Sequence, residues 1–380
     1  MPFIHRTRGG CKTFSALSCK TVSGQYSCRM SPRPAGTRPT LSLVAQAAGT
    51  SVPTVSKVLR GGTDVSAETR AKVMDAVHSV GYTRRPGNKV ETAVDEGTSS
   101  TALNLVVTHL EGSWANQVLV GVGSAAAASD LDLIITLAQP NTDWASRILR
   151  RRGVGVVGAL LDPASPQFST LVAAGVPMVL LEPMSAPPAG IPAIGVANWD
   201  AGRTAAEQLL ALGHRHMGVI AGYSRHIYSR ARVDGFRSAV DAAAGDTRVT
   251  VAPGQWDEAR AAADTHKLLD RDPAITAIFA CSDPMALGVY NALAERGLRI
   301  PDDVSVIGFD DLPEAHWISP TLTTMRQPSR EMGDSAVRML LDLTRPENPV
   351  RWARPRIEMS AELVVCASTG PARAAAAGSR

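Results

Sequence analysis

Residues 40–82 read TLSLVAQAAGTSVPTVSKVLRGGTDVSAETRAKVMDAVHSVGY, and this stretch decides the fold of the first part of the chain. Apolar residues recur at helical spacing in three short segments, which follow the helix-capping residues Thr40, Ser51 and Ser66. Pro53 stands in the first turn of the second segment, where its missing N–H costs nothing. Two short helices on a tight glycine-containing turn, with a third helix behind them, predict a helix-turn-helix.

The second helix of such a unit enters the major groove with its first residues toward the base edges. Val52 and Pro53 occupy those positions, which predicts apolar contact with bases, and Lys57 one turn later can reach a guanine edge or a phosphate. For Arg60 an ordinary surface position is an equal alternative. The DNA-binding residues predicted here are Thr40, Ser51, Val52, Pro53, Thr54, Ser56, Lys57, Arg60, Arg84 and Arg85.

Charge is distributed unevenly along the 380 residues. Residues 1–89 contain 14 Lys and Arg against 3 Asp and Glu, a net charge of +11, whereas residues 90–380 contain 25 against 32, a net charge of −7. A basic first quarter on a mildly acidic body is typical of a nucleic-acid-binding unit fused to a part with another task. For the basic residues before position 30, a solvated tail is the alternative.

From Leu103 onward, short runs rich in Val, Ile and Leu alternate with amphipathic segments. The runs predict buried parallel strands at 103–107, 131–137, 154–161, 176–182, 216–222, 277–281 and 304–311. Helices are predicted between them, including one at 231–243. Strand–helix alternation predicts an α/β fold, and its two successive sets favour two doubly wound lobes, although spacing alone leaves one large sheet open.

Several stretches carry a resemblance to a known family. Leu-x-x-Val-Ala-x-x-Ala-Gly-x-Ser-x-x-Thr-Val-Ser-Lys-Val-Leu at 41–59, then Val-Ser-x-x-Thr-Arg-x-x-Val at 65–73 and Gly-Tyr at 81–82, closely resembles the head-piece of the lactose/galactose repressor (LacI/GalR) family. GHRHMGVIAG (213–222), SDPMALGVYNALAERGLRIPDDVSVIGFDDLPEA (282–315) and SPTLTTMRQPSREMG (319–333) resemble its effector-binding core. The resemblance covers roughly residues 40–365. It implies a core like periplasmic sugar-binding proteins, with two lobes, crossover strands and a ligand cleft.

This family typically carries, between head-piece and core, a short hinge helix with an Ala-Arg-x-Leu core, whose leucines wedge into the minor groove. The sequence departs from that pattern, because Pro86-Gly87 opposes a helix and no leucine lies between Leu59 and Leu103. Leucine-wedged DNA bending is therefore doubtful here. The basic residues of the link can still follow phosphates or a minor groove.

Ligands of open α/β sheets lie beyond the carboxyl ends of the strands. Polar or aromatic side chains that follow the predicted strands include His109, Trp114, Arg230, Ser282 and Asp310. By family position, Arg230, Ser282, Asp310 and Gln327 correspond to ligand-contacting places in sugar-responsive repressors. These six residues are the predicted effector site. Carboxylates, arginines and an indole suit a polyhydroxylated ligand, because hydroxyls both donate and accept and an indole stacks on the C–H face of a sugar.

Structural roles compete with these assignments. A carboxylate of the Asp310-Asp311 pair can serve as a cap or turn residue, and Ser282 stands where many relatives carry Asn. Arg232 is interpreted as a structural salt-bridge residue rather than a contact. Trp199 and Trp256 suit either the core or the cleft.

Five parts are expected along the chain: a disordered N-terminal extension (1–37), a helix-turn-helix DNA-binding domain (38–84), a hinge or linker (85–101), a two-lobed effector-binding and dimerisation domain (102–369) and a disordered tail (370–380). No run of about 18 apolar residues predicts a membrane span, and the N-terminus lacks the apolar region of a signal peptide. The five cysteines form no CxxC pair. A cytoplasmic location is expected.

The sequence thus predicts a homodimeric, ligand-responsive transcription factor, a repressor that reads a roughly palindromic double-stranded DNA operator and responds to a small molecule, a sugar. A solute- or sugar-binding receptor without a DNA-binding role is the alternative. No enzyme, metal site or cofactor is predicted. Gly121-x-Gly123-x-x-Ala126 imitates a dinucleotide fingerprint, but it falls inside a predicted helix instead of a strand–helix turn.

Overall fold

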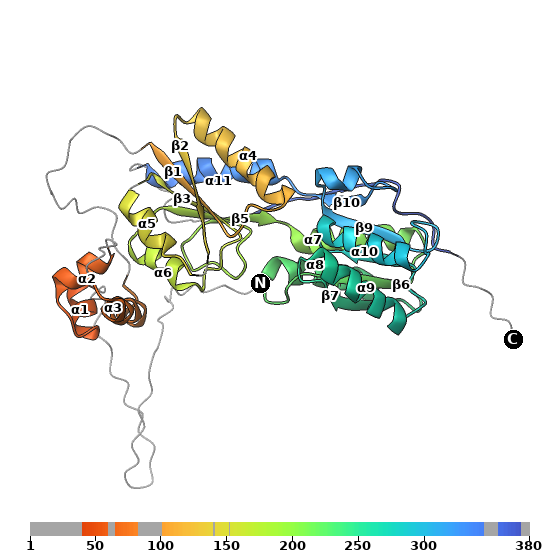
Figure 1. Cartoon of the computed structure of the whole chain (residues 1–380), viewed down its shortest axis with the longest axis horizontal. Helices are drawn as coiled ribbons and strands as arrows, with labels where there is room; N and C mark the ends of the chain where they lie inside the picture. Colours follow the sequence, from red (N-terminus) through yellow and green to blue (C-terminus); the bar gives the residue numbers. More distant parts are fainter. Residues whose placement is uncertain are drawn as a thin grey trace, which may run out of the picture.

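The structure, a computed structural model, describes residues 40–59, 65–82, 101–139, 141–151, 153–345 and 356–373. The predicted extension (1–37) lies outside these residues, as do Arg60, Arg84, Arg85 and all of the predicted link (85–101) except residue 101. The described elements form a small helical head and two α/β lobes (Figure 1).

The head consists of α1 (Leu41–Ala47), α2 (Val52–Leu59) and α3 (Ala67–Val80), at the positions the sequence predicts. The Thr40 and Ser66 hydroxyls accept the backbone N–H groups of Leu43 and Thr69, which lie three residues later in each helix. Gly81 ends α3 with a φ of 64°, a conformation that glycine adopts without strain. The apolar faces of the three helices share one core: Val44, Ala45, Val55, Val58, Leu59, Val73, Ala76 and Val77.

Lobe 1 contains a six-stranded parallel sheet in the order β11-β5-β4-β3-β1-β2. Its strands are β1 (Ala102–Val107), β2 (Asp132–Leu137), β3 (Gly155–Ala159), β4 (Met178–Leu181), β5 (Ala193–Val196) and β11 (Arg356–Met359). Its helices are α4 (Ser113–Ala128), α5 (Trp144–Arg151), α6 (Pro166–Ala173) and α11 (Ser329–Thr344). Helix α4 contains both glycines of the imitated dinucleotide fingerprint, so they do not form a strand–helix turn.

Lobe 2 contains a second six-stranded sheet in the order β12-β10-β9-β8-β6-β7, parallel except for the β10–β12 pair. Its strands are β6 (His216–Ala221), β7 (Arg248–Pro253), β8 (Ala277–Ala280), β9 (Ser305–Asp310), β10 (Thr323–Arg326) and β12 (Glu362–Val364). Its helices are α7 (Asn198–Ala211), α8 (Ile227–Ala242), α9 (Glu258–Arg271), α10 (Asp283–Glu295) and the 3₁₀ helix η1 (Pro313–His316). The two separate sheets exclude the single large sheet.

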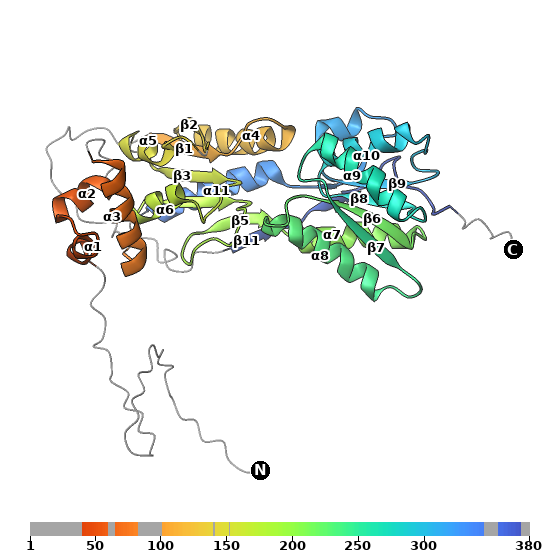
Figure 2. The same ribbon diagram turned by 60° about the horizontal axis from the view of Figure 1, so that its bottom comes forward.

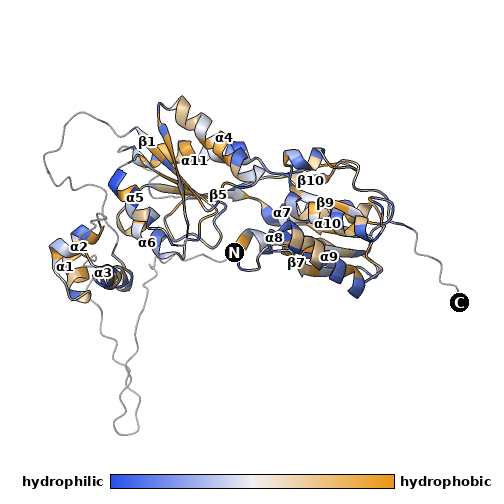
Figure 3. Cartoon of the chain, viewed as in Figure 1, coloured by the Kyte–Doolittle hydropathy of each residue, from blue (hydrophilic) through white to orange (hydrophobic). Residues whose placement is uncertain are grey.

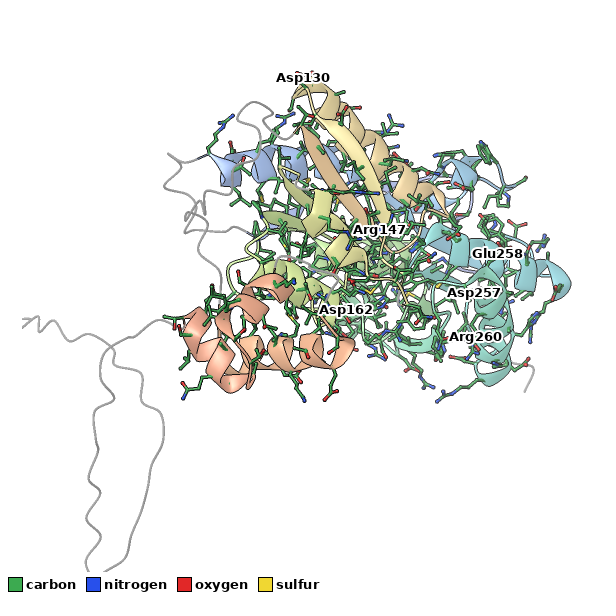
Figure 4. All side chains as sticks on the ribbon, turned by 60° about the vertical axis from the view of Figure 1, so that its left-hand side comes forward. Asp130, Arg147, Asp162, Asp257, Glu258 and Arg260 are labelled. Atoms are coloured by element: carbon green, nitrogen blue, oxygen red, sulfur yellow. The ribbon has the colours of Figure 1, made fainter. Side chains whose placement is uncertain are left out.

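The central strands of both lobes are hydrophobic, whereas the covering helices alternate hydrophobic and hydrophilic residues (Figure 3). This is the distribution that buried parallel strands and half-exposed helices require. Figure 4 draws the side chains and labels charged residues on the surface elements: Asp130 follows the end of α4 on lobe 1, and Asp257, Glu258 and Arg260 mark the start of α9 on lobe 2.

The chain passes between the lobes three times: between β5 and α7, between β10 and α11, and between β11 and β12. All seven predicted strands are present. The prediction missed β5, β7, β10, β11 and β12, which have six residues or fewer. Three of them (β7, β11, β12) have only partly buried residues, so their sequences lack a continuous apolar run.

The structure moves the beginning of the predicted C-terminal tail beyond residue 373. Residues 370–373, which the sequence analysis assigned to a disordered tail, bind lobe 2. The Gly370 carbonyl accepts from His214 Nε2 at 3.1 Å, and the Ala372 N–H donates to the Leu212 carbonyl at 2.9 Å. Backbone hydrogen bonds, which composition does not reveal, hold this segment.

The head contacts lobe 1 through α3 and α6, which lie side by side (Figure 2). His78 Nε2 is 3.1 Å from the Ser169 hydroxyl, and Ala173 packs into the apolar core of the head.

Candidate DNA-binding surface and effector site

Helix α2 has two faces. Val55, Val58 and Leu59 are buried in the head, as predicted, whereas Val52 and Pro53 at its start are exposed together with Lys57 one turn later. The hydroxyl of Ser51 accepts the Thr54 N–H at 3.3 Å and is 2.8 Å from Thr54 Oγ1. Ser56 is half-buried, and Thr40 is exposed at the start of α1. An exposed, capped helix start with a lysine one turn later is suited to a DNA groove.

The second site begins at the carboxyl end of β9. Asp310, the last residue of this strand, is 9% exposed and has a φ of 123°, a conformation that L side chains rarely adopt. Its Oδ1 accepts from Gln327 Nε2, just beyond β10. Burial raises the pKa of Asp310 to about 7, against the lowering effect of the nearby Arg232 charge. The carboxyl therefore titrates near neutral pH.

Arg232 of α8 is the cation of this site. Its guanidinium is 4% exposed and lies 3.9 Å from Asp310 Oδ1, measured from Nη1. Nε donates to Asn198 Oδ1 at 2.7 Å, Nη1 donates to the Cys281 carbonyl at 2.6 Å, and the group lies 3.5 Å from the centre of the Phe309 ring. Three elements thus fix the direction of one buried arginine.

Arg230, which the sequence analysis placed in the effector site, is instead exposed and donates to the Ser224 carbonyl at 2.8 Å. The difference comes from the start of α8, which the structure places at Ile227, four residues before the predicted 231–243 segment. Within a helix, residues two positions apart differ by about 200° in direction. Arg232 shares its face with the buried Phe236, so Arg230 points the other way. The ion pair with Asp310 agrees with the interpretation of Arg232 as a salt-bridge residue, and it also brings Arg232 to the strand ends where the effector site is predicted.

Lobe 1 contributes Trp114 from the first turn of α4. Its Nε1 donates to Gln327 Oε1 at 3.3 Å, so Trp114, Gln327 and Asp310 form one hydrogen-bonded series between the lobes. His109, after β1, is exposed and lies 2.9 Å from the Thr108 hydroxyl. Trp114 and His109 line a common hollow on lobe 1.

Ser282 has a structural role. It is buried and caps α10, because its hydroxyl accepts the Met285 N–H at 3.3 Å. Of the six predicted effector residues, the structure thus joins Trp114, Asp310 and Gln327 by hydrogen bonds, places Ser282 after β8, the neighbour of β9, leaves His109 after β1 in lobe 1, and exposes Arg230 on α8.

Aromatic residues of lobe 2 flank Arg232. The centres of the Tyr228 and Trp256 rings each lie 5.8 Å from its guanidinium carbon, so Trp256, left open by the sequence, belongs beside the site. His226 Nδ1 is 2.9 Å from the Tyr228 hydroxyl and accepts from Trp256 Nε1 at 3.1 Å. Burial lowers the pKa of His226 to about 4, so its imidazole is neutral at physiological pH. Trp199 is 40% exposed, with the Arg203 guanidinium over its ring.

Among the described residues, no group of three or more His, Cys, Asp or Glu side chains is arranged to hold a metal ion. Within the same part of the chain, no helix combines the length and the apolar character needed to cross a bilayer.

A helix-turn-helix head joined to two doubly wound lobes, with a buried ion pair at the strand ends, defines a DNA-binding regulator with a small-molecule site. Comparison with known proteins agrees with this class. Residues 40–85 match the model of bacterial regulatory proteins of the lacI family, and residues 206–369 match the periplasmic binding protein-like domain. The HTH-type transcriptional regulator CelR of Thermobifida fusca is 33% identical over 327 residues, covering 83% of this chain and 95% of CelR. The chain belongs to the LacI family of transcriptional regulators.

Solved structures give the same result. The CelR–cellobiose complex matches with a TM-score of 0.67 and 29% identity, over 87% of this chain and 100% of that one. A LacI family regulator from Enterococcus faecium with bound ribose matches with a TM-score of 0.63 and 25% identity, over 72% and 100% of the two chains. The predicted fold class and the predicted DNA-binding, effector-controlled regulator are confirmed. The individual site residues stay predictions.

Proposed function

We propose that this regulator is a repressor whose operator affinity is controlled by a neutral sugar bound between its lobes. The buried Arg232–Asp310 pair supports this proposal most directly, because it offers donors and acceptors where both lobes meet. Carboxyl groups outnumber arginine in this site: Asp310 and Glu182 are buried near Arg232, and Asp283 is buried near Asp310. This balance disfavours a phosphorylated ligand. The relatives bound to cellobiose and ribose support the same ligand class.

In this proposal the sugar is bound and not transformed. Asp310 and Asp311 are neighbours on one loop, so they cannot stand on opposite sides of a glycosidic bond. Asp311 is moreover engaged by Arg326 Nε at 2.6 Å and by His316 Nε2 at 2.9 Å. A regulator of transcription acts where the chromosome is, so we propose a cytoplasmic location.

The test measures fluorescence anisotropy of a labelled promoter fragment from the regulator's own locus, titrated with the full chain at low salt. Cellobiose, D-ribose and glucose 6-phosphate are then added separately. We expect nanomolar-range DNA affinity that a neutral sugar changes at least tenfold, which a 1.4 kcal/mol coupling produces. DNA binding without any sugar response contradicts the effector assignment. Sugar binding without DNA binding favours the solute receptor.

Replacing Lys57 by alanine is expected to weaken operator binding about tenfold and to reduce the salt dependence of binding by about one unit of slope, because one phosphate or guanine contact is lost. Lys72→Ala is the matched control, since Lys72 lies on α3 and pairs with Glu68 at 2.7 Å. Sugar binding by both variants should equal that of the wild type. Equal loss of DNA affinity in both variants would show that α2 is not the reading helix.

We further propose a homodimer, because a two-fold operator requires two heads. Lobe 1 offers a surface for it: β2 is the edge strand of its sheet, and Val120, Ile135 and Leu137 on α4 and β2 are 47%, 39% and 37% exposed. Exposed large apolar side chains at a sheet edge are typical of an interface.

The dimer prediction concerns Ile135→Asp. A carboxylate buried at this interface is expected to shift the protein to monomers in sedimentation velocity and to weaken operator binding more than tenfold, because the second head is lost. Val365→Asp is the control, since Val365 is an isolated residue that is 59% exposed. A dimer unchanged by Ile135→Asp would place the interface elsewhere.

A further inference from the structure

Two buried polar residues next to Arg232, Glu182 and Asn198, interact with each other as well as with the arginine. Glu182 follows β4 in lobe 1 and is 4% exposed, with a φ of 43°. Asn198 is the first residue of α7, where the chain has just passed from lobe 1 to lobe 2. Both side chains are buried, and neither has an apparent role in packing apolar surface.

Glu182 is surrounded by donors. Its Oε1 accepts the Val196 N–H, and Asn198 Nδ2 lies 3.4 Å from Oε1 and 3.2 Å from Oε2. A carboxylate has only acceptors, so in its ionised form Glu182 accepts all of these contacts at once. Burial raises the pKa of Glu182, and the Arg232 charge and the hydrogen bonds from Val196 and Asn198 act against this rise. The same Asn198 Nδ2 also donates to the Val196 carbonyl at 2.9 Å.

These acceptors decide which way the Asn198 amide points. The oxygen and nitrogen ends of an amide have nearly the same shape, so only their hydrogen-bond partners distinguish them. Acceptors on the Glu182 side require Nδ2 there, which leaves Oδ1 toward Arg232. Arg232 Nε then donates to Asn198 Oδ1 at 2.7 Å. The reverse orientation would set two donors against each other at Arg232.

We infer that Glu182 and Asn198 are positioning residues of the effector site: Glu182 orients the Asn198 amide, and Asn198 in turn fixes the direction of the Arg232 guanidinium. The inference rests on the proposed function, since it concerns the same site. It also joins the lobes, because the end of β4 in lobe 1 holds, through α7, an arginine of α8 in lobe 2.

The decisive variants reverse the donors and acceptors. In Glu182→Gln an NH₂ group replaces one of the two carboxylate oxygens that face Asn198 Nδ2, so the amide keeps only the Val196 carbonyl and one Gln oxygen as acceptors and is held less firmly toward Arg232. Asn198→Asp sets two carboxyl groups beside each other. In the double variant E182Q/N198D, the Gln donates to the new carboxylate, which also accepts from Arg232 Nε. The double variant thereby keeps the negative charge but carries it at residue 198 instead of residue 182.

The first readout needs no sugar. In the full chain labelled with ¹⁵N-arginine, the buried Nε–H of Arg232 should give one exchange-protected resonance, assigned by its loss in Arg232→Lys. We expect this resonance to lose protection in E182Q and in N198D and to regain it in the double variant. The control E207Q also lies on α7, where Glu207 pairs with Arg203 at 2.7 Å on the surface, and it should leave the resonance unchanged.

The second readout is the affinity for cellobiose and D-ribose by isothermal titration. Each single variant should weaken binding of the sugar that the wild type accepts about tenfold or more, and the double variant should recover it to within about threefold, because the hydrogen bond to a charged group is restored. Thermal unfolding of all variants reports any folding defect, which the double variant also corrects.

Unchanged Arg232 protection in E182Q, or single-variant losses that simply add in the double variant, overturns the inference. A wild type that binds neither sugar, with an Nε–H resonance that follows the expected pattern, contradicts the proposed function and leaves the positioning role established.

Discussion

Replacing Arg232 by methionine is expected to abolish the sugar response and to lower the free energy of unfolding by about 3 kcal/mol, since removing one partner of a buried charge pair leaves the other charge uncompensated. Asp310 would lose the cation 3.9 Å away, and Asn198 Oδ1 and the Cys281 carbonyl would lose their donors. Methionine keeps the unbranched apolar stem of the side chain but lacks the guanidinium carbon that contacts the Phe309 ring.

Urea unfolding followed by circular dichroism measures the loss of stability, and anisotropy of the promoter fragment with added sugar measures the response. Arg230→Met is the matched control on the same helix. Because Arg230 is exposed, its replacement should change the free energy of unfolding by no more than about 0.5 kcal/mol and leave the response intact. A sugar response that persists in R232M but is lost in R230M would support Arg230, the residue assigned to the effector site from the sequence, instead of Arg232.

The second large effect is a pH dependence of sugar affinity. Sugar hydroxyls donate most strongly to an ionised carboxylate, and the pKa of Asp310 is raised to about 7 by burial. Only the ionised fraction is competent to bind, so affinity should rise roughly tenfold between pH 6 and pH 8. Isothermal titration at both values measures it, and Asp310→Asn should bind weakly with little pH dependence. A wild-type affinity that falls with rising pH would contradict this role of Asp310.

The contribution of Asp310 to the free energy of unfolding should fall as pH rises, whereas the affinity for sugar should increase. The native state keeps the Asp310 proton up to about pH 7, whereas the unfolded chain releases it near the ordinary aspartate pKa, so the native state binds more protons in between. The contribution of this carboxyl to stability is therefore complete below about pH 4 and is lost as pH rises to about 7. Subtracting the Asp310→Asn unfolding curve removes this contribution together with the part of the raised pKa of Asp283 that the Asp310 charge causes.

The sequence predicts best those helices and strands that are determined by residues close together in the chain. The head is set by caps and apolar spacing within 43 residues, so Thr40, Ser66 and Gly81 mark its helices correctly. Strands with continuous apolar runs were equally visible. Strand β11 was not, because its four residues are specified by pairing with β5, about 160 residues earlier in the chain.

The effector site was predicted in part for the same reason. Asp310 and Trp114 follow strands that the sequence reveals, and their positions are those the strand-end rule selects. Arg232, interpreted from the sequence as a salt-bridge residue, faces Asp310 because α8 starts earlier than predicted, which changes the residue that faces inward. Glu182 and Asn198 carry no local signal, since their roles arise only when β4, α7 and α8 come together.

The three passages between the lobes also constrain how such regulators diversify. The sheet of lobe 1 takes β11, and that of lobe 2 takes β12, from the last part of the described chain, so neither lobe is one continuous segment. A single genetic junction before residue 101 exchanges the head for another and keeps the whole sensor. Exchange of one lobe alone needs junctions at all three passages. Recombination among relatives should therefore join an existing sensor to a different head, and so to a different operator, far more readily than it combines lobes from two sensors.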